Sequence, residues 1–175
     1  MIKKFAKDSY TEMNELVLPN DTNTFGNLMG GRLLYWMDIC SAMAAQKHSN
    51  SPVVTVSVDN VSFTRSIKLG EVVTIQAKVS RAFSTSMEVR MEIFAHNLPE
   101  GTRVKTNEAY YTFVAIDEQT RPRKVAELVP ETEEEKQIFD GALRRRELRL
   151  ILGGKMKPEH ASTLKDLVNL FSEKG

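Results

Sequence analysis

The chain has 175 residues, 41% of them hydrophobic, which suits one globular domain with room for a short appendage. Its 24 basic and 23 acidic residues nearly cancel, and a net charge of +1 argues against a nucleic acid partner. The single cysteine, Cys40, excludes an internal disulfide framework and a cysteine-rich metal site. Because the sequence shows neither a leading apolar segment nor a run of about 18 apolar residues, we expect a cytoplasmic protein without a membrane span.

The first part of the chain predicts a short strand, a loop and one long helix. The strand covers residues 12–18 and ends at the turn residues Pro19-Asn20-Asp21. The loop leads to a helix over residues 32–47. Nearly every side of this helix is apolar or small, which is typical of a helix buried in a core.

From residue 53 onward the pattern changes to β-branched and alternating segments that predict strands. The expected strands are 53–58 with a continuation through 63–65, 71–79, 86–96 and 106–116. Short connections containing Gly70, Pro99 and Gly101 join them. One buried helix followed by hairpin-linked strands predicts an α+β fold, in which a largely antiparallel sheet wraps the helix.

The last part of the chain has a different composition. From residue 131 it is helical and highly charged, with acids first and bases later, an order that complements a helix dipole. Gly153-Gly154 would end this helix, and residues 158–174 predict a second, amphipathic helix. We therefore divide the chain into a domain of residues 1–130 and a helical C-terminal extension of residues 131–175.

Asp38 is the sharpest chemical feature of the sequence. It is the only charged residue between Arg32 and Lys47, and no lysine or arginine lies three or four positions away. An unpaired carboxylate in an apolar helix is costly, so a functional role such as proton transfer is one explanation. The alternative is that Asp38 lies on a partly exposed strip of the helix, or meets a distant cation such as Arg65.

Five further residues, of three types, could act near the start of the same helix. Backbone N–H groups at Gly30 and Gly31 could stabilise an oxyanion or bind phosphate, although a plain turn or packing role is equally consistent with the pair. Asn23 and Asn27 could orient a water there, although loop asparagines more often make turns. The Thr55 hydroxyl could reach the same region from the next strand, although strand threonines are more often structural.

Other catalytic patterns are weak. His48, His96 and His160 lack metal-ligand spacing, and the sequence contains no Gly-x-Ser-x-Gly motif of a nucleophilic serine. We therefore expect neither a metal nor any cofactor.

Together these residues resemble the hotdog-fold acyl-CoA thioesterases, in the bacterial type of the branch called cytosolic acyl-CoA hydrolases. The resemblance rests first on residues 21–38, Asp-Thr-Asn-Thr-Phe-Gly-Asn-Leu-Met-Gly-Gly-Arg-Leu-Leu-Tyr-Trp-Met-Asp. It continues at His48, 53–59, 61–63, 70–73, 84–89, 115–117 and 130–136. It covers residues 8 to 150, and nothing beyond residue 150 matches the family.

The resemblance implies a curved antiparallel sheet wrapped around a long helix. Two such units would form a double-hotdog dimer with the active site at its interface, and three dimers would form a hexamer, a trimer of dimers. It also implies catalytic roles for Asn23, Asp38 and Thr55. In many bacterial members a histidine pair stands where this chain has Thr24-Phe25, a departure that bears on acyl preference more than on the reaction.

The resemblance also implies binding residues. The amides near Gly30 and Gly31 would receive the thioester carbonyl, with Asn27 as a neighbour of the site because some relatives carry aspartate there. The remaining residues would bind the CoA phosphates by resemblance and by their chemistry. They are Arg65, Arg81, Ser84, Thr85 and Ser86.

The expected function is hydrolysis of a fatty acyl-CoA to free fatty acid and CoA, with Asp38 acting as general base or as nucleophile. The main alternative is a non-catalytic acyl-CoA sensor of the same fold, which the joint presence of Asn23, Asp38 and Thr55 disfavours. A hotdog dehydratase would place a histidine near the site, whereas His48 lies at the far end of the helix. A purely structural oligomer would leave Asp38 unexplained.

Overall fold

The structure is a computed structural model that describes residues 3–59, 61–63 and 65–164. The chain divides after Val129 into two compact units. The first unit contains the sheet and the long helix, and the second contains the charged helix.

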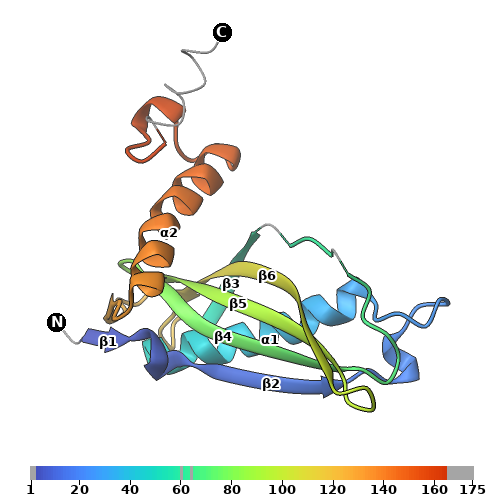
Figure 1. Ribbon diagram of the computed structural model, residues 1–175. Coiled ribbons are helices and arrows are strands. Elements are labelled where there is room, and N and C mark those ends of the chain that lie inside the picture. Colours follow the sequence, from blue (N-terminus) through green and yellow to red (C-terminus); the bar gives the residue numbers. More distant parts are fainter. Residues whose placement is uncertain (1–2, 60, 64, 165–175) are drawn as a thin grey trace, which may run out of the picture. The chain divides into compact units, whose positions relative to one another are not determined.

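A five-stranded antiparallel sheet forms the centre of the first unit (Figure 1), in the order β2-β4-β5-β6-β3. Its strands are β2 (Thr11–Leu16), β3 (Val53–Asp59), β4 (Val72–Ala82), β5 (Ser86–Asn97) and β6 (Thr102–Ala115). Side chains point alternately to the two faces of a strand, so the apolar alternation of β5 buries Met87, Val89, Met91 and Ile93 on one face. The apolar faces of β4 and β6 join this face through the paired register of the three long strands.

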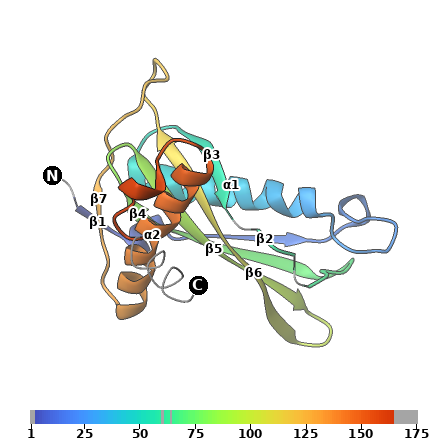
Figure 2. The same ribbon diagram turned by 90° about the horizontal axis from the view of Figure 1, so that it is seen from above.

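Helix α1 (Gly30–Ser49) lies along the apolar face of the sheet, and the strands cross it obliquely (Figures 1 and 2). Its inner face is buried and consists of Leu33, Trp36, Met37, Cys40, Ser41, Ala44, Ala45 and His48. The predicted α+β fold is confirmed. The expectation that α1 is buried on nearly every side is wrong for a single chain, because Tyr35 and Met43 on its outer face are exposed.

Two details of the first unit differ from the sequence predictions. A parallel pair of three-residue strands, β1 (Lys3–Phe5) and β7 (Glu127–Val129), was not expected, because such short segments carry no periodicity. The predicted continuation of β3 through 63–65 is wrong, since β3 ends at Asp59 and residues 61–63 and 65 are not in a strand. Two 3-10 turns, η1 (Ala6–Ser9) and η2 (Pro19–Asp21), flank β2.

The second unit is built on helix α2 (Glu133–Leu152). Thr132 and Glu135 form a capping box at its start, which explains why it begins there. The predicted second helix does not begin at Pro158, because Pro158–His160 form a 3-10 turn, η3, and residues 165–174 lie outside the described part. Within the unit, the Glu147 carboxylate accepts hydrogen bonds from the backbone and hydroxyl groups of Ser162 and Thr163.

Candidate functional site

Asp38 lies where the inner and outer faces of α1 meet, and its side chain is half-buried. The Thr55 hydroxyl donates a hydrogen bond of 2.8 Å to Asp38 Oδ1. Thr55 can do this because it pairs with Phe113 and therefore shares the helix-facing side of the sheet. In the described part of the chain no cation, Arg65 included, lies within ion-pairing distance of Asp38. Its carboxylate is thus oriented by a hydroxyl and not neutralised by a salt bridge.

A third residue close to Asp38 was not predicted from the sequence. Tyr111 on β6 is buried, and its hydroxyl has no hydrogen-bond partner among the described residues. Burial raises the pKa of Tyr111 to about 12, and the negative charge of Asp38 adds to the shift. An aromatic residue in an alternating strand is indistinguishable from ordinary core by sequence, so no signal marked its proximity to Asp38.

A cavity of about 260 Å³ lies at the N-terminal end of α1. Among the predicted site residues it is lined by Asn23, Asn27, Gly30 and Arg65. The Asn23 side-chain oxygen accepts from the amides of Phe25 and Asn27, so it fixes the loop. Its NH₂ group donates to no described residue and remains available as a donor.

The two glycines at this end of α1 differ in their surroundings. A side chain at Gly30 would come within 3.2 Å of the Phe63 ring, whereas one at Gly31 would meet nothing within 4 Å. Neither amide donates a hydrogen bond to any residue that the structure describes, since the first helical turn has no internal acceptors for them. The Gly30 amide lies beside the 260 Å³ cavity, whereas Gly31 does not line it, and adjacent free N–H groups of this kind suit the binding of a developing oxyanion.

The predicted residues fall into three places within one chain. Gly30 and Asp38 are eight residues apart on α1, which corresponds to about 12 Å along the helix axis. The hairpin that carries Ser84, Thr85 and Ser86 lies at the opposite end of α1, because its Ser84 carbonyl accepts from the Val125 amide near the helix C-terminus. Arg81 belongs to the same end of β4. A single chain therefore does not bring all of them together.

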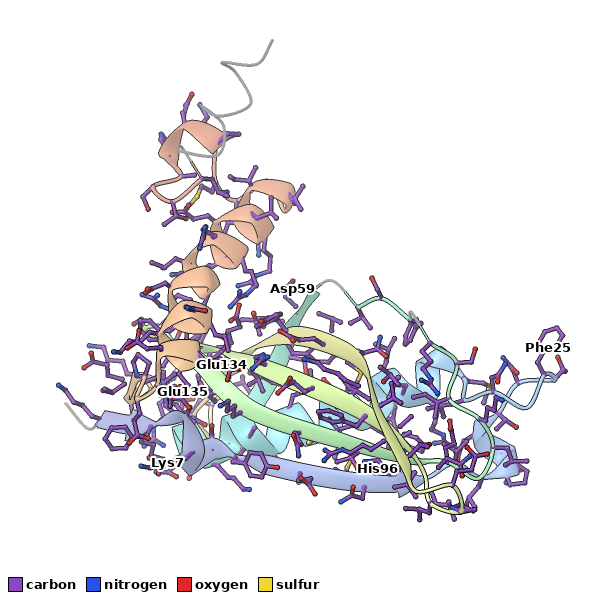
Figure 3. The ribbon with its side chains drawn as sticks, in the orientation of Figure 1. Lys7, Phe25, Asp59, His96, Glu134 and Glu135 are labelled. Carbon is purple, nitrogen blue, oxygen red and sulfur yellow. The ribbon has the colours of Figure 1, made fainter. Side chains whose placement is uncertain are left out.

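Exposed apolar side chains lie on the two elements that carry Asp38 and Thr55. Tyr35 and Met43 of α1 and Val56 and Val58 of β3 are all exposed. β3 is also an edge strand, with one row of backbone groups left unpaired by the sheet. Figure 3 shows Phe25 at the tip of the loop before α1, where its ring is 86% exposed.

The described residues contain no group of three acidic, histidine or cysteine side chains that could hold a metal ion. Among the same residues, no helix is long and apolar enough to cross a membrane. What the site offers is therefore a carboxylate, hydroxyl and amide groups, and exposed cations.

Sequence comparisons place these features among known proteins. The Thioesterase superfamily profile matches residues 25–101. Mouse acyl-coenzyme A thioesterase 11 is 39% identical over 94% of this chain, although the chain spans only 26% of that protein. The uncharacterized acyl-CoA thioester hydrolase YkhA of Bacillus subtilis is 33% identical over 81% of this chain and 83% of its own length.

Solved structures are similar as well. A hexameric acyl-CoA thioesterase without ligand has 39% identity and a TM-score of 0.82, covering 85% of this chain and 96% of its own. A Staphylococcus aureus acyl-CoA hydrolase in complex with butyryl coenzyme A, coenzyme A and coenzyme A disulfide has 34% identity and a TM-score of 0.80, covering 87% and 95%. Further structures of that hydrolase carry alanine in place of an asparagine, an aspartate and a threonine, spaced by 15 and 17 residues.

Proposed function

The chain belongs to the hotdog-fold acyl-CoA thioesterase family, and from that membership we propose that it hydrolyses the thioester of a fatty acyl-CoA to a free fatty acid and coenzyme A. The hydrogen bond from Thr55 to an otherwise unpaired Asp38 carries the proposal. Asn23, Asp38 and Thr55 repeat the spacing of 15 and 17 residues of the three positions replaced in the S. aureus hydrolase. This agreement supports catalytic roles for these three residues.

The proposed chemistry follows from two sets of groups: the amides of Gly30 and Gly31 at the start of α1, and the Asp38 carboxylate with the Thr55 hydroxyl. The thioester oxygen accepts from the amides of Gly30 and Gly31, which stabilise the charge that develops on it. Asp38 takes a proton from a water that attacks the carbonyl carbon, and Thr55 keeps the carboxylate in position. The carbon–sulfur bond then breaks, and Asp38 returns its proton to the leaving sulfur, so that coenzyme A departs as the thiol. Direct attack by Asp38 is the alternative. It would release the thiol and form a mixed anhydride between Asp38 and the acyl group, which water then hydrolyses, and mass spectrometry of a rapidly quenched single turnover distinguishes the two routes by whether the chain transiently gains the mass of the acyl group.

We propose that the complete site is shared between two subunits, because Gly30 and Asp38 of one chain are about 12 Å apart along the helix. The exposed apolar side chains beside Asp38 and the open edge of β3 offer a surface for a second copy. The hexameric relatives support a homo-oligomer, which we propose to be a trimer of such dimers. The cytosolic acyl coenzyme A thioester hydrolase of mouse, with 31% identity, supports the cytoplasm as the location of the present protein.

The proposed CoA-binding residues belong to two places. Arg65 lines the cavity at the start of α1, and Arg81 with Ser84, Thr85 and Ser86 lies at the other end of the helix. In a dimer the second group would come from the partner subunit. Asn27 lines the first cavity and would act as a neighbour of Asn23.

The test is release of free CoA, detected with a thiol reagent, from short, medium and long acyl-CoA. Asp38→Asn should lower kcat by at least about a hundredfold, because general-base catalysis typically contributes that much or more. Glu118→Gln, which removes an exposed carboxylate far from the site in sequence, serves as the matched control with unchanged rate. If the wild type binds acyl-CoA but releases no CoA at any chain length, the protein is a sensor and not a hydrolase.

A further inference from the structure

The Tyr111 hydroxyl is a buried polar group in an apolar part of the sheet. Tyr111 is 1% exposed, and its hydroxyl oxygen has no hydrogen-bond partner among the described residues. An unpaired buried hydroxyl costs free energy that a phenylalanine at the same position would avoid. Because a single chain already buries this hydroxyl, neither the substrate nor a second copy of the chain would contact it. Its partner is therefore to be sought in the interior of the same chain.

The strands on either side of Tyr111 carry no polar side chain opposite it. In the paired register of the sheet, Tyr111 lies between Val89 of β5 and Val58 of β3. Its remaining neighbour is α1, which packs against β6. Burial raises the pKa of Tyr111, and among the charged groups that the structure describes, Asp38 is the one that adds to this shift. The polar group nearest to the hydroxyl in effect is therefore the Asp38 carboxylate.

Asp38 has one carboxylate oxygen left for such a contact. Thr55 donates to Asp38 Oδ1 at 2.8 Å, and none of the described residues donates to Oδ2. Thr55 pairs with Phe113, which lies two residues from Tyr111 on the same face of β6, or about 7 Å along the strand. Thr55 and Tyr111 thus face α1 from neighbouring positions of the sheet. The Asp38 carboxylate can be held from the sheet side while its exposed side stays open to a substrate.

We propose that Tyr111 is a positioning residue for Asp38: its hydroxyl donates to one buried water, which in turn donates to Asp38 Oδ2. This inference rests on the proposed hydrolase function. No direct hydrogen bond joins the two side chains, and buried waters typically bridge polar groups that would otherwise be unpaired. Donors to both oxygens fix the plane of the carboxylate, so that its free lone pairs point at the water that attacks the thioester. Tyr111 contacts neither that water nor the substrate and acts through Asp38.

The first experiment measures turnover in Tyr111→Phe, which keeps the ring and removes the hydroxyl. The variant should lower kcat for acyl-CoA about fivefold with little change in KM, the worth of about one hydrogen bond that orients the base. The acid limb of kcat/KM against pH should move to higher pH, because a donor to a carboxylate favours its charged form. An unchanged kcat with an unchanged pH profile would make Tyr111 an ordinary core residue and overturn the proposal.

The neighbouring tyrosine of β6 provides the matched control. The Tyr110 hydroxyl donates to Glu108 Oε1 at 2.8 Å, and Tyr110 points to the other face of the sheet because adjacent side chains of a strand alternate. Tyr110→Phe therefore removes the same group from the same strand without affecting Asp38. Its kcat and its pH profile should equal those of the wild type. Equal losses of kcat in Tyr110→Phe and Tyr111→Phe would reflect a general disturbance of β6 and overturn the proposal.

The second experiment tests the contact without turnover, by urea unfolding at one fixed protein concentration. In the wild-type background Tyr111→Phe should lower the urea midpoint, because it removes a satisfied hydrogen bond. In the Asp38→Ala background the same change should leave the midpoint unchanged or raise it, since the hydroxyl has then lost its acceptor. Equal shifts of the midpoint in both backgrounds would overturn the contact. If the protein hydrolyses no acyl-CoA but the shifts differ, the proposed function fails while the contact between Tyr111 and Asp38 is supported.

Discussion

The two faces of α1 have similar composition but different surroundings. On the inner face Met37, Cys40 and Ala44 are fully buried against the sheet of the same chain. On the outer face Tyr35 is 57% exposed and Met43 38% exposed. Asp38, the only carboxylate of the helix, stands between the two faces, where it is half-buried and bound by Thr55.

Under the proposed function, this difference means that one apolar helix serves two partners. The inner face packs against the sheet of its own chain, and this packing stabilises the fold. The outer face exposes apolar surface that water does not favour, and under the proposed function a second copy of the chain covers it. A carboxylate at the boundary avoids the full cost of burial and can act on a substrate that enters between two copies.

Adjacent substitutions on the two faces should separate folding from assembly. Ala44→Asp places an unpaired charge on the inner face and should cost more than about 4 kcal/mol, so little folded protein remains. Met43→Asp places the same charge on the outer face, and it should leave the circular dichroism spectrum intact while lowering the mass measured by light scattering. Unfolding of both variants, or an unchanged mass for Met43→Asp, would contradict the view that the inner face stabilises the fold and the outer face the assembly.

Mixing two inactive variants tests whether the outer face completes the site. Asn23→Ala and Asp38→Asn each remove one half of the proposed site, so each homo-oligomer should be nearly inactive. After subunit exchange, mixed dimers contain one intact site, and the rate should recover to roughly a quarter of the wild type. Differently tagged chains verify the exchange by co-purification. Exchange without recovery of activity would place each site within a single chain.

The hydrogen bond between Thr55 and Asp38 should have a smaller effect. Thr55→Val keeps the shape of the side chain but removes the donor, and kcat should fall about tenfold, the worth of about 1.4 kcal/mol of lost orientation of a charged group. Thr55→Ser keeps the donor and should retain most of the rate. A raised KM with unchanged kcat in Thr55→Val would mean that Thr55 binds substrate and does not orient Asp38.

The sequence predicted those features that have a local physical cause. Alternation and β-branching marked the strands of the main sheet, and the apolar run marked α1. The isolated charge of Asp38 stood out by itself, but its hydrogen bond with Thr55 was not predicted, because the sequence placed the Thr55 hydroxyl near the start of the helix and the family resemblance implied only catalytic roles for both residues. The pair β1 and β7 was missed, because three residues are too few to show a period. The exposure of Tyr35 could not be predicted, because sequence does not tell which molecule covers an apolar face.

Proximity between residues that are distant in the sequence could not be predicted from local patterns. No motif of the sequence marked Arg123 or Lys124, and only the fold places them in one cavity with Lys4. Tyr111 lies close to Asp38 through the packing of β6 on α1, which no motif records. In both cases the information lies in which strands and helix meet, and no single segment contains it.

The smallest predicted effect concerns His48, a titratable group of the inner face. Its burial lowers its pKa below the ordinary 6.5, and nearby Lys4 acts in the same direction, while the hydrogen bond to Ala126 and the charge of Asp8 oppose it. The unfolded chain therefore binds a proton more readily than the folded one. The stability contributed by neutral His48 is fully present above pH 6.5 and is lost as the pH falls toward the lower folded pKa.

His48→Gln tests this linkage, because glutamine can still donate to the Ala126 carbonyl but does not titrate. Urea unfolding between about pH 7.5 and 5 should show a smaller decrease of the free energy of unfolding in the variant than in the wild type. His160→Gln removes an exposed histidine of the second unit. Its free energy of unfolding should decrease with falling pH as that of the wild type does. Identical slopes in all three proteins would mean that His48 keeps its ordinary pKa. The inner face would then be accessible to water at the C-terminal end of α1, and the inner and outer faces would differ only in the extent of their burial.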